Sequence, residues 1–438
     1  MKVLKFGGTS VGSPSRMKEV AEIVNNSEEQ KIVVLSAVSG TTNKLVEITS
    51  LHANGKSSEA TSCCEELRAE YTPFVEELLS ESKFSDEALR IVDQRFEGMR
   101  KLLSQNYSDK TEKLILAEGE IISTNLFHLF LSSIGKDSYL LNALDFMALD
   151  EQEEPNQTSI KMSLSNHING VHNEVIVTQG YICRNHRGQV DNLKRGGSDY
   201  TATLIGAALK SSEVQIWTDI DGVHNNDPRV VENTMPIAEL SFDEAGELAY
   251  FGAKILHPSC ILPAQQGNVP VRIKNTLVPQ APGTLITSEK KTDDIKAIAV
   301  KDGITAIKIK STRMINAYGF LKKVFEVFEK YETPIDMITT SEIAVSLTID
   351  KPGQLENIVH ELRPFGMIEI DKDQSIICIV GNFVAEKKGI VKKVFSCLDD
   401  IPVRMISYGG SKNNISVLID SNYKAEALIN LNRGVFGL

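Results

Sequence analysis

The sequence predicts an α/β protein with a mainly parallel sheet, followed by a duplicated α+β module. Up to about residue 275, short β-rich runs alternate with helical stretches such as 114–135. Such alternation is typical of a parallel sheet with crossover helices. After residue 295 one sequence pattern occurs twice, which indicates an internal repeat. The short apolar, β-rich runs are 31–40, 174–182 and 213–222, each with Gly, Ser or Asp at or near its end.

Size and composition limit the classes of function. A chain of 438 residues is long enough for two or three domains. The net charge of −11 without a basic block argues against nucleic acid or an anionic membrane as the main partner. No metal-ligand spacing joins the six cysteines or the histidines, so we expect reduced thiols and no metal site. No signal-peptide pattern or long apolar run occurs, which predicts a cytoplasmic protein.

The first twelve residues, MKVLKFGGTSVG, predict a strand that runs into a glycine turn. Gly7 and Gly8 would let backbone N–H groups approach a phosphate closely, and Lys5 adds a positive charge beside them. The order of residues differs from the Walker A loop. An ordinary strand–turn–helix start is the alternative.

Two further segments combine a strand end or a Gly-Gly turn with polar residues at a helix start. Residues 36–43, SAVSGTTN, follow a strand and include Ser36 and Thr42. Residues 193–201, LKRGGSDYT, place Arg195 before a helix and Ser198 and Asp199 at its start; an arginine there is suited to a carboxylate. Helix N-caps are the alternative for the hydroxyls and for Asp199.

The run at 213–222 ends in a polar loop that begins near Trp217 and continues to Arg229. The loop contains Thr218, Asp219 and Arg229, which could contact a nucleotide, although Asp-Gly and Asp-Pro also favour a plain surface turn. Glu120 lies in the apolar helical stretch 114–135, where a single glutamate is more often on the solvated face.

Residues 275–294 are rich in Pro, Gly, Thr and charge and predict a connection between domains. The repeat that follows starts at Gly319 and again at Gly389, and both copies share G-x-x-K-K-V-F and P-x-x-M-I. Each copy predicts a helix with one apolar face and two strands. The residues expected on these faces are Leu321, Val324, Phe325 and Phe328 in the first copy, and Val391, Val394, Phe395 and Leu398 in the second.

The segments KFGGTSV, SGTTNKL, EGEIIST, RGGSDYTA, WTDIDGV, DPRVV, FGAKILHP and ITTSE, in this order, resemble the aspartate kinases. The resemblance covers almost the whole chain and implies a monofunctional enzyme that phosphorylates the side-chain carboxylate of L-aspartate. It implies an amino-acid-kinase domain at 1–290 and two ACT-like, ferredoxin-like modules at 295–438. The first module would span about 304–373, and the second about 375–438 with a strand from 295–303.

Roles for individual residues follow from the resemblance. The catalytic set it implies is Lys5, Gly7, Gly8 and Asp199. The set implied for aspartate is Ser36, Thr42, Glu120, Tyr181, Arg195 and Ser198. The set implied for ATP is Thr218, Asp219, His224, Arg229 and Lys254. Mg²⁺ would arrive on the nucleotide, with no tightly bound cofactor. Relatives often have Tyr at position 224, and some have Phe at position 181.

The two copies of the repeat differ in charge where Asp336 aligns with Arg404. A ligand with an additional ammonium would favour the first copy, which predicts lysine as an inhibitor of the first step of the aspartate-derived amino-acid pathway. A solvated Asp336 is the alternative, and Ala317 and Pro334 replace serines of some lysine-sensitive relatives. The residues that match the lysine-site segment of the family are Met314, Gly319, Phe320, Leu321, Asp336, Thr340, Ser341 and Glu342.

Two other functions compete with this interpretation. One is a different amino-acid kinase that acts on glutamate or its N-acetyl form, against which the repeat and ITTSE argue. The other is a non-catalytic amino-acid sensor, which would lack Lys5, Arg195 or Asp199, yet all three are present. We expect a homodimer or homotetramer, because exposed edges of ACT sheets tend to be paired.

Overall fold

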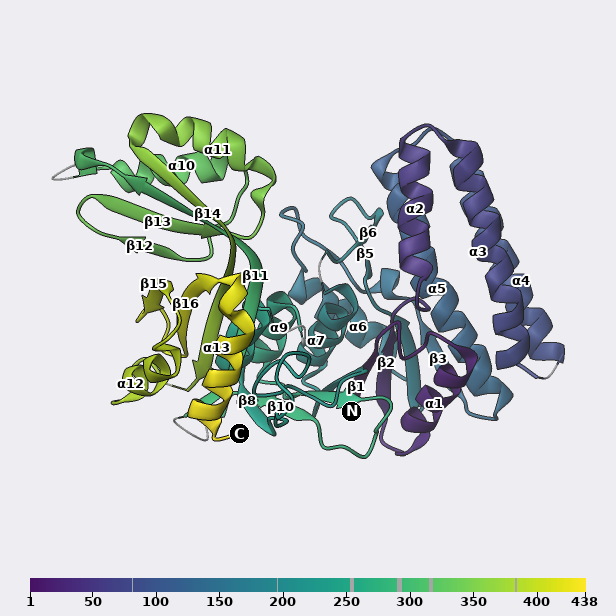
Figure 1. Ribbon diagram of the computed structural model, residues 1–438. Helices are drawn as coiled ribbons and strands as arrows, with labels where there is room; N and C mark the ends of the chain where they lie inside the picture. The colour runs from purple at the N-terminus through teal and green to yellow at the C-terminus, as the bar shows by residue number, and fades with distance from the viewer. Residues whose placement is uncertain (81, 195, 253–255, 290–293, 315–317, 383) are drawn as a thin grey trace. The chain divides into compact units, whose positions relative to one another are not determined.

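The computed structural model describes residues 1–80, 82–194, 196–252, 256–289, 294–314, 318–382 and 384–438 (Figure 1). The chain divides into two compact units, one formed by 1–223 with 255–288 and the other by 224–254 with 289–438. Segment 224–254, which the expected boundary at 290 would assign to the first domain, therefore belongs to the second unit. The family boundaries themselves stay a prediction.

The first unit is built on a mainly parallel sheet, as predicted. Within this unit its strands follow the order β3-β4-β2-β1-β7-β9-β10, and only β10 runs antiparallel to its neighbour. The bounds are β1 Lys2–Phe6, β2 Lys31–Leu35, β3 Ser138–Leu141, β4 Val175–Gln179, β7 Val214–Thr218, β9 Val271–Asn275 and β10 Thr284–Thr287. Strand β10 lies inside the expected connection 275–294, so that expectation is wrong for these residues.

Helices cover both faces of this sheet, which explains why its strands are apolar on both sides. Leu4 and Phe6 of β1 share one core with the first five helices, while Lys5 alternates to the face where α7 packs. The first five helices are α1 Pro14–Asn25, α2 Thr41–Ala53, α3 Ser57–Leu78, α4 Ser82–Leu103 and α5 Asp109–Ser133. The others are α6 Gln157–Ile168, α7 Gly197–Leu209 and α9 Pro258–Gly267; a short hairpin comprises β5 Ile182–Arg184 and β6 Val190–Asn192, and η1 is Ala143–Asp145.

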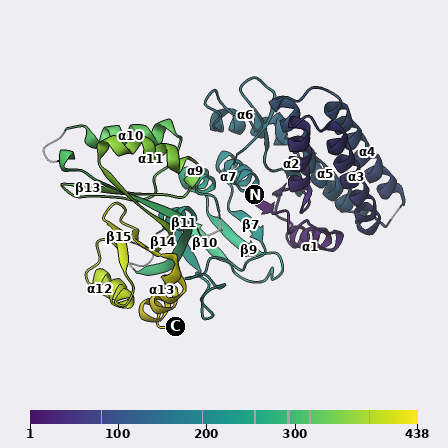
Figure 2. The ribbon, with the colours of Figure 1, turned by 45° about the horizontal axis from the view of Figure 1, so that its top comes forward.

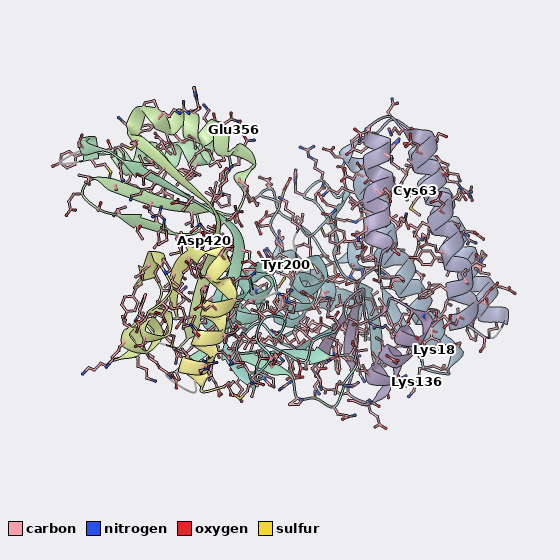
Figure 3. All side chains as sticks on the ribbon, viewed as in Figure 1. Lys18, Cys63, Lys136, Tyr200, Glu356 and Asp420 are labelled. Atoms are coloured by element: carbon pink, nitrogen blue, oxygen red, sulfur yellow. The ribbon has the colours of Figure 1, made fainter. Side chains whose placement is uncertain are left out.

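Side chains fill the space between these elements, with Cys63 inside the helical bundle and Lys18 and Lys136 outside it (Figure 3). Among the described residues one helix, α5, is long and apolar enough by length and composition to cross a membrane. Of its most apolar window, 72% is buried in the protein. Its apolar side chains therefore serve the core of the first unit.

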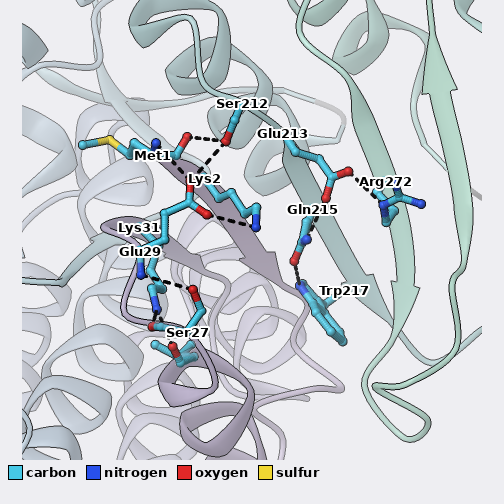
Figure 4. Close-up of polar contacts among 11 residues, drawn as sticks. Met1, Lys2, Ser27, Glu29, Lys31, Ser212, Glu213, Gln215, Trp217 and Arg272 are labelled. Carbon is cyan, nitrogen blue, oxygen red and sulfur yellow. Dashed lines mark hydrogen bonds and ion pairs between the residues drawn. The ribbon is translucent and has the colours of Figure 1, made fainter.

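The amino ends of the parallel strands carry a polar network (Figure 4). Glu29 binds the amino group of Met1 at 3.2 Å and the Lys2 ammonium at 3.0 Å. The buried Lys31 donates to the carbonyl of Val24 at 2.8 Å, near the end of α1. Lysine favours such carbonyls because they carry the negative end of the helix dipole. These contacts fix the edge of the sheet that lies opposite the glycine turn.

The second unit contains one antiparallel sheet in the order β12-β13-β11-β14-β16-β15. Its two long central strands pair along both repeats: 295–301 of β11 pair with 376–381 of β14, and 304–310 pair with 367–374. The bounds are β11 Ile295–Lys310, β12 Ile338–Thr340, β13 Ala344–Ile349, β14 Met367–Gly381, β15 Val403–Tyr408 and β16 Asn414–Asp420.

Each repeat has a core of its own on this sheet. Figure 2 shows α10 and α11 side by side over one half of the sheet. The helical bounds are α8 Phe242–Tyr250, α10 Phe320–Lys330, α11 Leu355–Leu362, α12 Ile390–Phe395 and α13 Lys424–Leu431. The remaining elements are β8 Glu239–Ser241, the short 3₁₀ helices Thr312–Met314, Pro352–Gln354, Arg363–Phe365, Ser396–Leu398 and Ser421–Tyr423, and the π-helix Asn432–Phe436.

The helix faces expected from the repeat are only half right. In α10, Val324 and Phe328 are buried as predicted, but Leu321 and Phe325 are 37% and 40% exposed and Val327 is buried instead. The spacing i, i+3, i+4 of apolar residues fits two overlapping stripes here, and packing selects the one that is centred on Val324 and Phe328. In the second copy Val394 and Leu398 are buried, Phe395 is partly buried, and Val391 is exposed.

Candidate active site

The predicted site segments of the first unit meet at the carboxyl edge of its parallel sheet. Phe6 at the end of β1 is in register with Leu35 of β2 and with Trp217 of β7, and Leu35 is in register with Gln179 of β4. The glycine turn, Ser36 and Tyr181 come after β1, β2 and β4, and Thr218 is the last residue of β7, so all of them lie at one edge of the sheet. Ligands of open α/β sheets bind at this edge.

Lys5 and Asp199 form an ion pair at the centre of this edge. The distance from Lys5 Nζ to Asp199 Oδ1 is 2.6 Å, and both side chains are mostly buried. Lys5 points to the face of β1 on which α7 packs, and Asp199 lies in the first turn of α7. A Cβ built on Gly7 would lie 3.6 Å from the Lys5 ammonium, so the glycine turn borders that charge directly.

Two helices begin at this edge without a side-chain cap. Gly40 precedes α2 and Gly196 precedes α7; both adopt the left-handed conformation, and neither helix has a side-chain cap bond. The alternative interpretation of Asp199 and of segment 36–43 as helix N-caps is therefore wrong. Uncapped N–H groups at a helix start, together with the helix dipole, favour anions.

A pocket of about 470 Å³ collects most residues that the resemblance assigns to aspartate. Its lining includes the predicted residues Gly8, Ser36, Thr42, Glu120, Tyr181 and Ser198. Ser36 Oγ donates to Ser198 Oγ at 3.0 Å, which joins the second and third segments. Arg195 is predicted for the same set but lies outside the described residues.

Glu120 is buried in this pocket, and its side chain is not on the solvated face of α5. The residue is 4% exposed, and burial raises the pKa of its carboxyl group to about 7. Oε1 accepts a hydrogen bond from the backbone N–H of Ala37 at 3.3 Å. Oε2 is buried without a hydrogen-bond partner among the described residues. A buried carboxylate oxygen without a donor is suited to a cationic group of a ligand.

Tyr181 reaches the pocket from a strained turn. Its φ of 68° lies in the left-handed region, where a non-glycine residue is uncommon. Thr201 Oγ1 accepts from its backbone N–H at 3.0 Å and holds the turn in place. A Cβ on Gly197 would lie 2.4 Å from Cδ2 of the Tyr181 ring, so only glycine permits this approach. The packed turn fixes the aromatic ring at one wall of the pocket.

The residues predicted for ATP are divided between the two units. Thr218 is the last residue of β7 in the first unit and Asp219 follows it, and Thr218 Oγ1 donates to Asp219 Oδ1 at 3.2 Å. His224 and Arg229 belong to the second unit. Nδ1 of His224 lies 2.8 Å from Thr234 Oγ1, and Arg229 forms a two-pronged ion pair with Asp227 at 2.7 and 2.9 Å. Lys254 lies outside the described residues.

The acidic residue expected to bind the effector is not a solvated charge. The side chain of Asp336 is 2% exposed, and its Oδ1 lies 2.5 Å from the Lys301 ammonium. Lys301 also binds Asp350 at 2.9 Å, and Tyr250 of α8 donates to Asp336 Oδ1 at 3.2 Å. Burial raises the pKa of Asp336, and its Oδ2 has no hydrogen-bond partner among the described residues.

The other residues of the expected effector segment lie nearer the surface. Gly319 has a φ of 80° and precedes α10. Phe320 packs edge-on against Phe365. Met314 is half-buried, whereas Leu321, Thr340, Ser341 and Glu342 are exposed. In the second copy Arg404 is paired with Asp371, so its charge is already compensated.

Several pocket residues were not found from the sequence. Ala37 contributes its backbone N–H to Glu120, and Thr9 and Lys194 line the pocket. Lys194 and Thr9 directly adjoin predicted residues, so the strand-end rule could have included them. The contact of Ala37 could not be predicted, because a backbone donor carries no side-chain signal. Among the described residues no group of three or more His, Cys, Asp or Glu side chains could hold a metal ion.

Comparison with known families agrees with this geometry. The model of the amino acid kinase family matches residues 1–275, and a model of the ACT domain matches residues 377–434. Aspartokinase 2, chloroplastic, of Arabidopsis thaliana is 35% identical and aligns over 99% of this chain and 84% of its own length. Lysine-sensitive aspartokinase 3 of Escherichia coli is 30% identical over 99% of both chains.

Solved structures show the same fold. E. coli aspartokinase III in complex with lysine and aspartate (T-state) has a TM-score of 0.83 at 30% identity, covering 100% of this chain and 99% of that one. The complex with aspartate and ADP (R-state) has the same TM-score and identity and covers 100% of both chains. The chain therefore belongs to the aspartokinases, within the amino acid kinase family. The predicted fold class is confirmed.

Proposed function

We propose that this aspartokinase transfers the γ-phosphoryl group of Mg·ATP to the side-chain carboxylate of L-aspartate and forms 4-phospho-L-aspartate. The observation that carries the proposal is a pocket whose lining includes Glu120, with its unpartnered carboxylate oxygen, and residues of two uncapped helix starts. Ser198 in this lining is next in sequence to Asp199 of the Lys5–Asp199 ion pair. An amino-acid dicarboxylate offers one cation and two anions, which matches that distribution of charge.

The substrate would be held by its charged groups. We assign its ammonium to Glu120, and its α-carboxylate to Arg195 on the basis of the family resemblance. Ser36, Thr42 and Ser198 would donate or accept hydrogen bonds, and Tyr181 would form the apolar wall. Binding at several points places the nucleophilic carboxylate near the phosphate, and positioning of this kind is a large part of phosphoryl-transfer catalysis.

The transfer itself needs positive charge more than it needs proton transfer. Both reacting groups are anionic, and an unperturbed aspartate side chain titrates near 3.9, so the nucleophile is already ionised at pH 7. Lys5 and the amides of Gly7 and Gly8 would stabilise charge on the transferring group. Asp199, which is bonded to Lys5, would orient that ammonium rather than act as a base.

ATP would contact Thr218, Asp219, His224, Arg229 and Lys254. For Arg229, this contact requires its guanidinium to leave or share Asp227. Mg²⁺ supplies charge neutralisation of the phosphates. Mg²⁺ usually keeps waters and phosphate ligands with one or two carboxylates, so a dedicated cluster of protein ligands is not required. Asp199, which is paired with Lys5, and Asp219, which follows Thr218, are carboxylates that adjoin the proposed phosphate and nucleotide contacts.

Lysine is the proposed inhibitor, bound in the first repeat. Asp336 and Asp350 share the single ammonium of Lys301, so this cluster carries one uncompensated negative charge when both carboxylates are ionised. The free Oδ2 of Asp336 offers a place for the ammonium of an effector. Calorimetric titration with lysine, threonine and methionine tests the choice, and heat with threonine alone would refute it.

Helix α8 is the proposed route from the effector segment to the nucleotide segment. Its Tyr250 donates to Asp336 in the first repeat. Its Glu247 accepts from Ser411 at 2.5 Å and from Asn414, both in the second repeat. The helix thus contacts both repeats, and the proposed ATP residue Lys254 follows it in sequence. Both repeats can therefore act on the position of α8.

A homodimer or homotetramer through the ACT modules and a cytoplasmic location are part of the same proposal. The edge strands β12 and β15 of the second unit carry the exposed apolar residues Ile338 and Ile406, which suit pairing between subunits. Sedimentation with and without lysine would measure the assembly.

Release of ADP in the presence of different amino acids tests the activity. We expect ADP with L-aspartate, and little with L-glutamate or N-acetyl-L-glutamate. Equal ADP release without any amino acid would show a nucleotide hydrolase, and release with N-acetylglutamate alone would assign the chain to another amino acid kinase.

A further inference from the structure

A buried glutamine connects two walls of the substrate pocket. Gln179 is the last residue of β4 and is 3% exposed. Its Nε2 donates to Thr124 Oγ1 at 2.7 Å, and its Oε1 accepts from the backbone N–H of Ala143 at 2.8 Å. Both ends of the amide are therefore used inside the protein. A buried amide with satisfied partners enforces its geometry, because each broken bond leaves a desolvated polar group.

Thr124 transmits this contact to Glu120. It lies one turn after Glu120 on α5, is fully buried, and its hydroxyl lies 2.9 Å from the Glu120 carbonyl oxygen and 3.1 Å from that of Ile121. A hydroxyl can accept one bond and donate another. Thr124 therefore accepts from Gln179 and donates to the helix backbone at the residue whose carboxylate lines the pocket.

On its other side Gln179 leads directly into the turn of Tyr181. Gly180 donates its N–H to the Leu35 carbonyl at 2.9 Å, and the Tyr181 N–H bonds to Thr201. The carboxylate of Glu120 and the ring of Tyr181 therefore belong to two elements, α5 and the end of β4, that the contact between Gln179 and Thr124 holds together. We name this contact the Gln179–Thr124 bridge.

We propose that the Gln179–Thr124 bridge sets the position of Glu120 relative to the rest of the pocket and so helps to select aspartate over glutamate. The inference rests on the proposed role of Glu120 as the ammonium partner. If the ammonium is held at a fixed point, a side chain that is longer by one methylene brings its carboxylate to a different place. Discrimination by one methylene in enzyme pockets is typically 10–200-fold. Gln179 and Thr124 are positioning residues in this account, because they act through Glu120.

Two nearly isosteric substitutions test the bridge. Gln179→Met removes both polar atoms of the side-chain amide, and Thr124→Val removes the hydroxyl. In each variant we expect KM for aspartate to rise on the order of tenfold, the scale of one lost buried hydrogen bond. We expect KM for ATP to stay within twofold, and the ratio of kcat/KM for aspartate to that for glutamate to fall. The rise in KM for aspartate in the double variant should be smaller than the two single effects combined, because both substitutions break the same hydrogen bond.

Thr49→Val is the matched control. Thr49 is also a buried helical threonine whose hydroxyl donates to a carbonyl of its own helix, that of Val46 at 3.0 Å, but it lies away from the pocket. Its loss should lower the melting temperature without a change in KM for aspartate. Thermal melts of all variants separate loss of folding from loss of positioning.

Two results would overturn the bridge: equal rises of both KM values, or an unchanged ratio of aspartate to glutamate turnover in folded variants. A wild-type enzyme that does not use aspartate contradicts the proposed function instead. The same comparison made with the amino acid it does use then decides whether Gln179 positions Glu120.

Discussion

At the residue scale, the site depends on charges that lie far apart in the sequence and are brought together by the sheet. Lys5 comes from the first strand and Asp199 from a later helix, yet their side chains are 2.6 Å apart. An ammonium that is already fixed by a partner does not have to reorganise during the reaction, which is why preorganised donors are effective. This contact leads to the first prediction.

Lys5→Met should lower kcat on the order of 10²–10³, as for the loss of one preorganised donor of the transition state. Lys2→Met is the matched control, since Lys2 lies on the same strand at the opposite edge of the sheet and binds only Glu29 among the described salt bridges. Steady-state kinetics at saturating aspartate and ATP measure the effect. Comparable kcat values for the two variants would remove Lys5 from the catalytic set.

The affinity for aspartate should depend on pH through Glu120. Its pKa is raised to about 7 by burial, and the proposed ammonium contact needs the ionised form. Affinity should therefore be full well above pH 7 and should fall as the pH drops through 7, by up to about tenfold per pH unit when no other group compensates. Calorimetric titration with aspartate between pH 5.5 and about 8.5, a range centred on that pKa, measures this dependence.

Glu120→Gln should bind aspartate weakly at every pH in that range. Glu118 supplies a control, because burial also raises its pKa to about 7 although it faces Arg95 and does not line the pocket. Glu118→Gln should keep the pH dependence of the wild type. If only Glu118→Gln abolished the pH dependence of aspartate affinity, Glu118 and not Glu120 would be its source, and the prediction would be contradicted.

Glu120 also shows how far single residues can be predicted from a sequence. Its position among Leu, Ile and Phe favoured a solvated face, and only the family resemblance indicated a role. The structure buries it, because the hydroxyl-rich segment 36–43 and the helix α2 that begins in it pack against that part of α5. Contacts between distant segments of this kind have no periodic signal in the sequence.

At the scale of elements, helix α8 is the part whose importance was least visible. It was expected in the catalytic domain, but it contacts both repeats of the second unit. If α8 transmits the effect of lysine to the kinase site, the hydrogen bond from Tyr250 to Asp336 can be tested separately from lysine binding. By linkage, a contact contributes to coupling only when it differs between the liganded and free states.

Tyr250→Phe should leave lysine binding nearly unchanged and weaken inhibition by about tenfold, the scale of a hydrogen bond to a charged group. Calorimetry gives the binding constant and initial rates give the inhibition. Tyr331→Phe is the matched control, since Tyr331 also donates to a carboxylate of the first repeat, Glu361, at 2.6 Å. Full inhibition of the Tyr250→Phe enzyme by lysine would contradict the role of α8.

The strands and helices were predictable to different degrees. Strands β2, β4 and β7 lie within the predicted runs 31–40, 174–182 and 213–222. They could be predicted because short apolar runs that end in polar residues are a distinctive pattern for buried strands. Strand β10 was not predicted, because the Pro and Gly residues before it indicated a loop, although its four residues form a strand beside β9. The face of α10 was half wrong because Leu321 and Phe325 extend its apolar stripe past the buried part.

At the scale of the whole molecule, the repeat is the feature that sequence and structure share most clearly. Two cores of similar composition lie on one sheet, and strands β11 and β14 each contribute to both. The duplication was visible from G-x-x-K-K-V-F. The strand at 295–303 expected to complete the second copy was implied only by the family resemblance, because its pairing with β14 joins residues far apart in the sequence. The Lys301–Asp336 ion pair likewise joins residues that are distant in the sequence. It shows that Asp336 is a buried, paired carboxylate and not a solvated charge.

Trapping of the product with hydroxylamine is the most direct test of the central claim. The full chain is incubated with Mg·ATP and either L-aspartate, L-glutamate or N-acetyl-L-glutamate, with and without lysine, and the hydroxamate is measured. We predict hydroxamate from aspartate alone, because only an acyl phosphate on its side chain is formed, and we predict that lysine suppresses it. Hydroxamate from another substrate, or none from aspartate, would contradict the account.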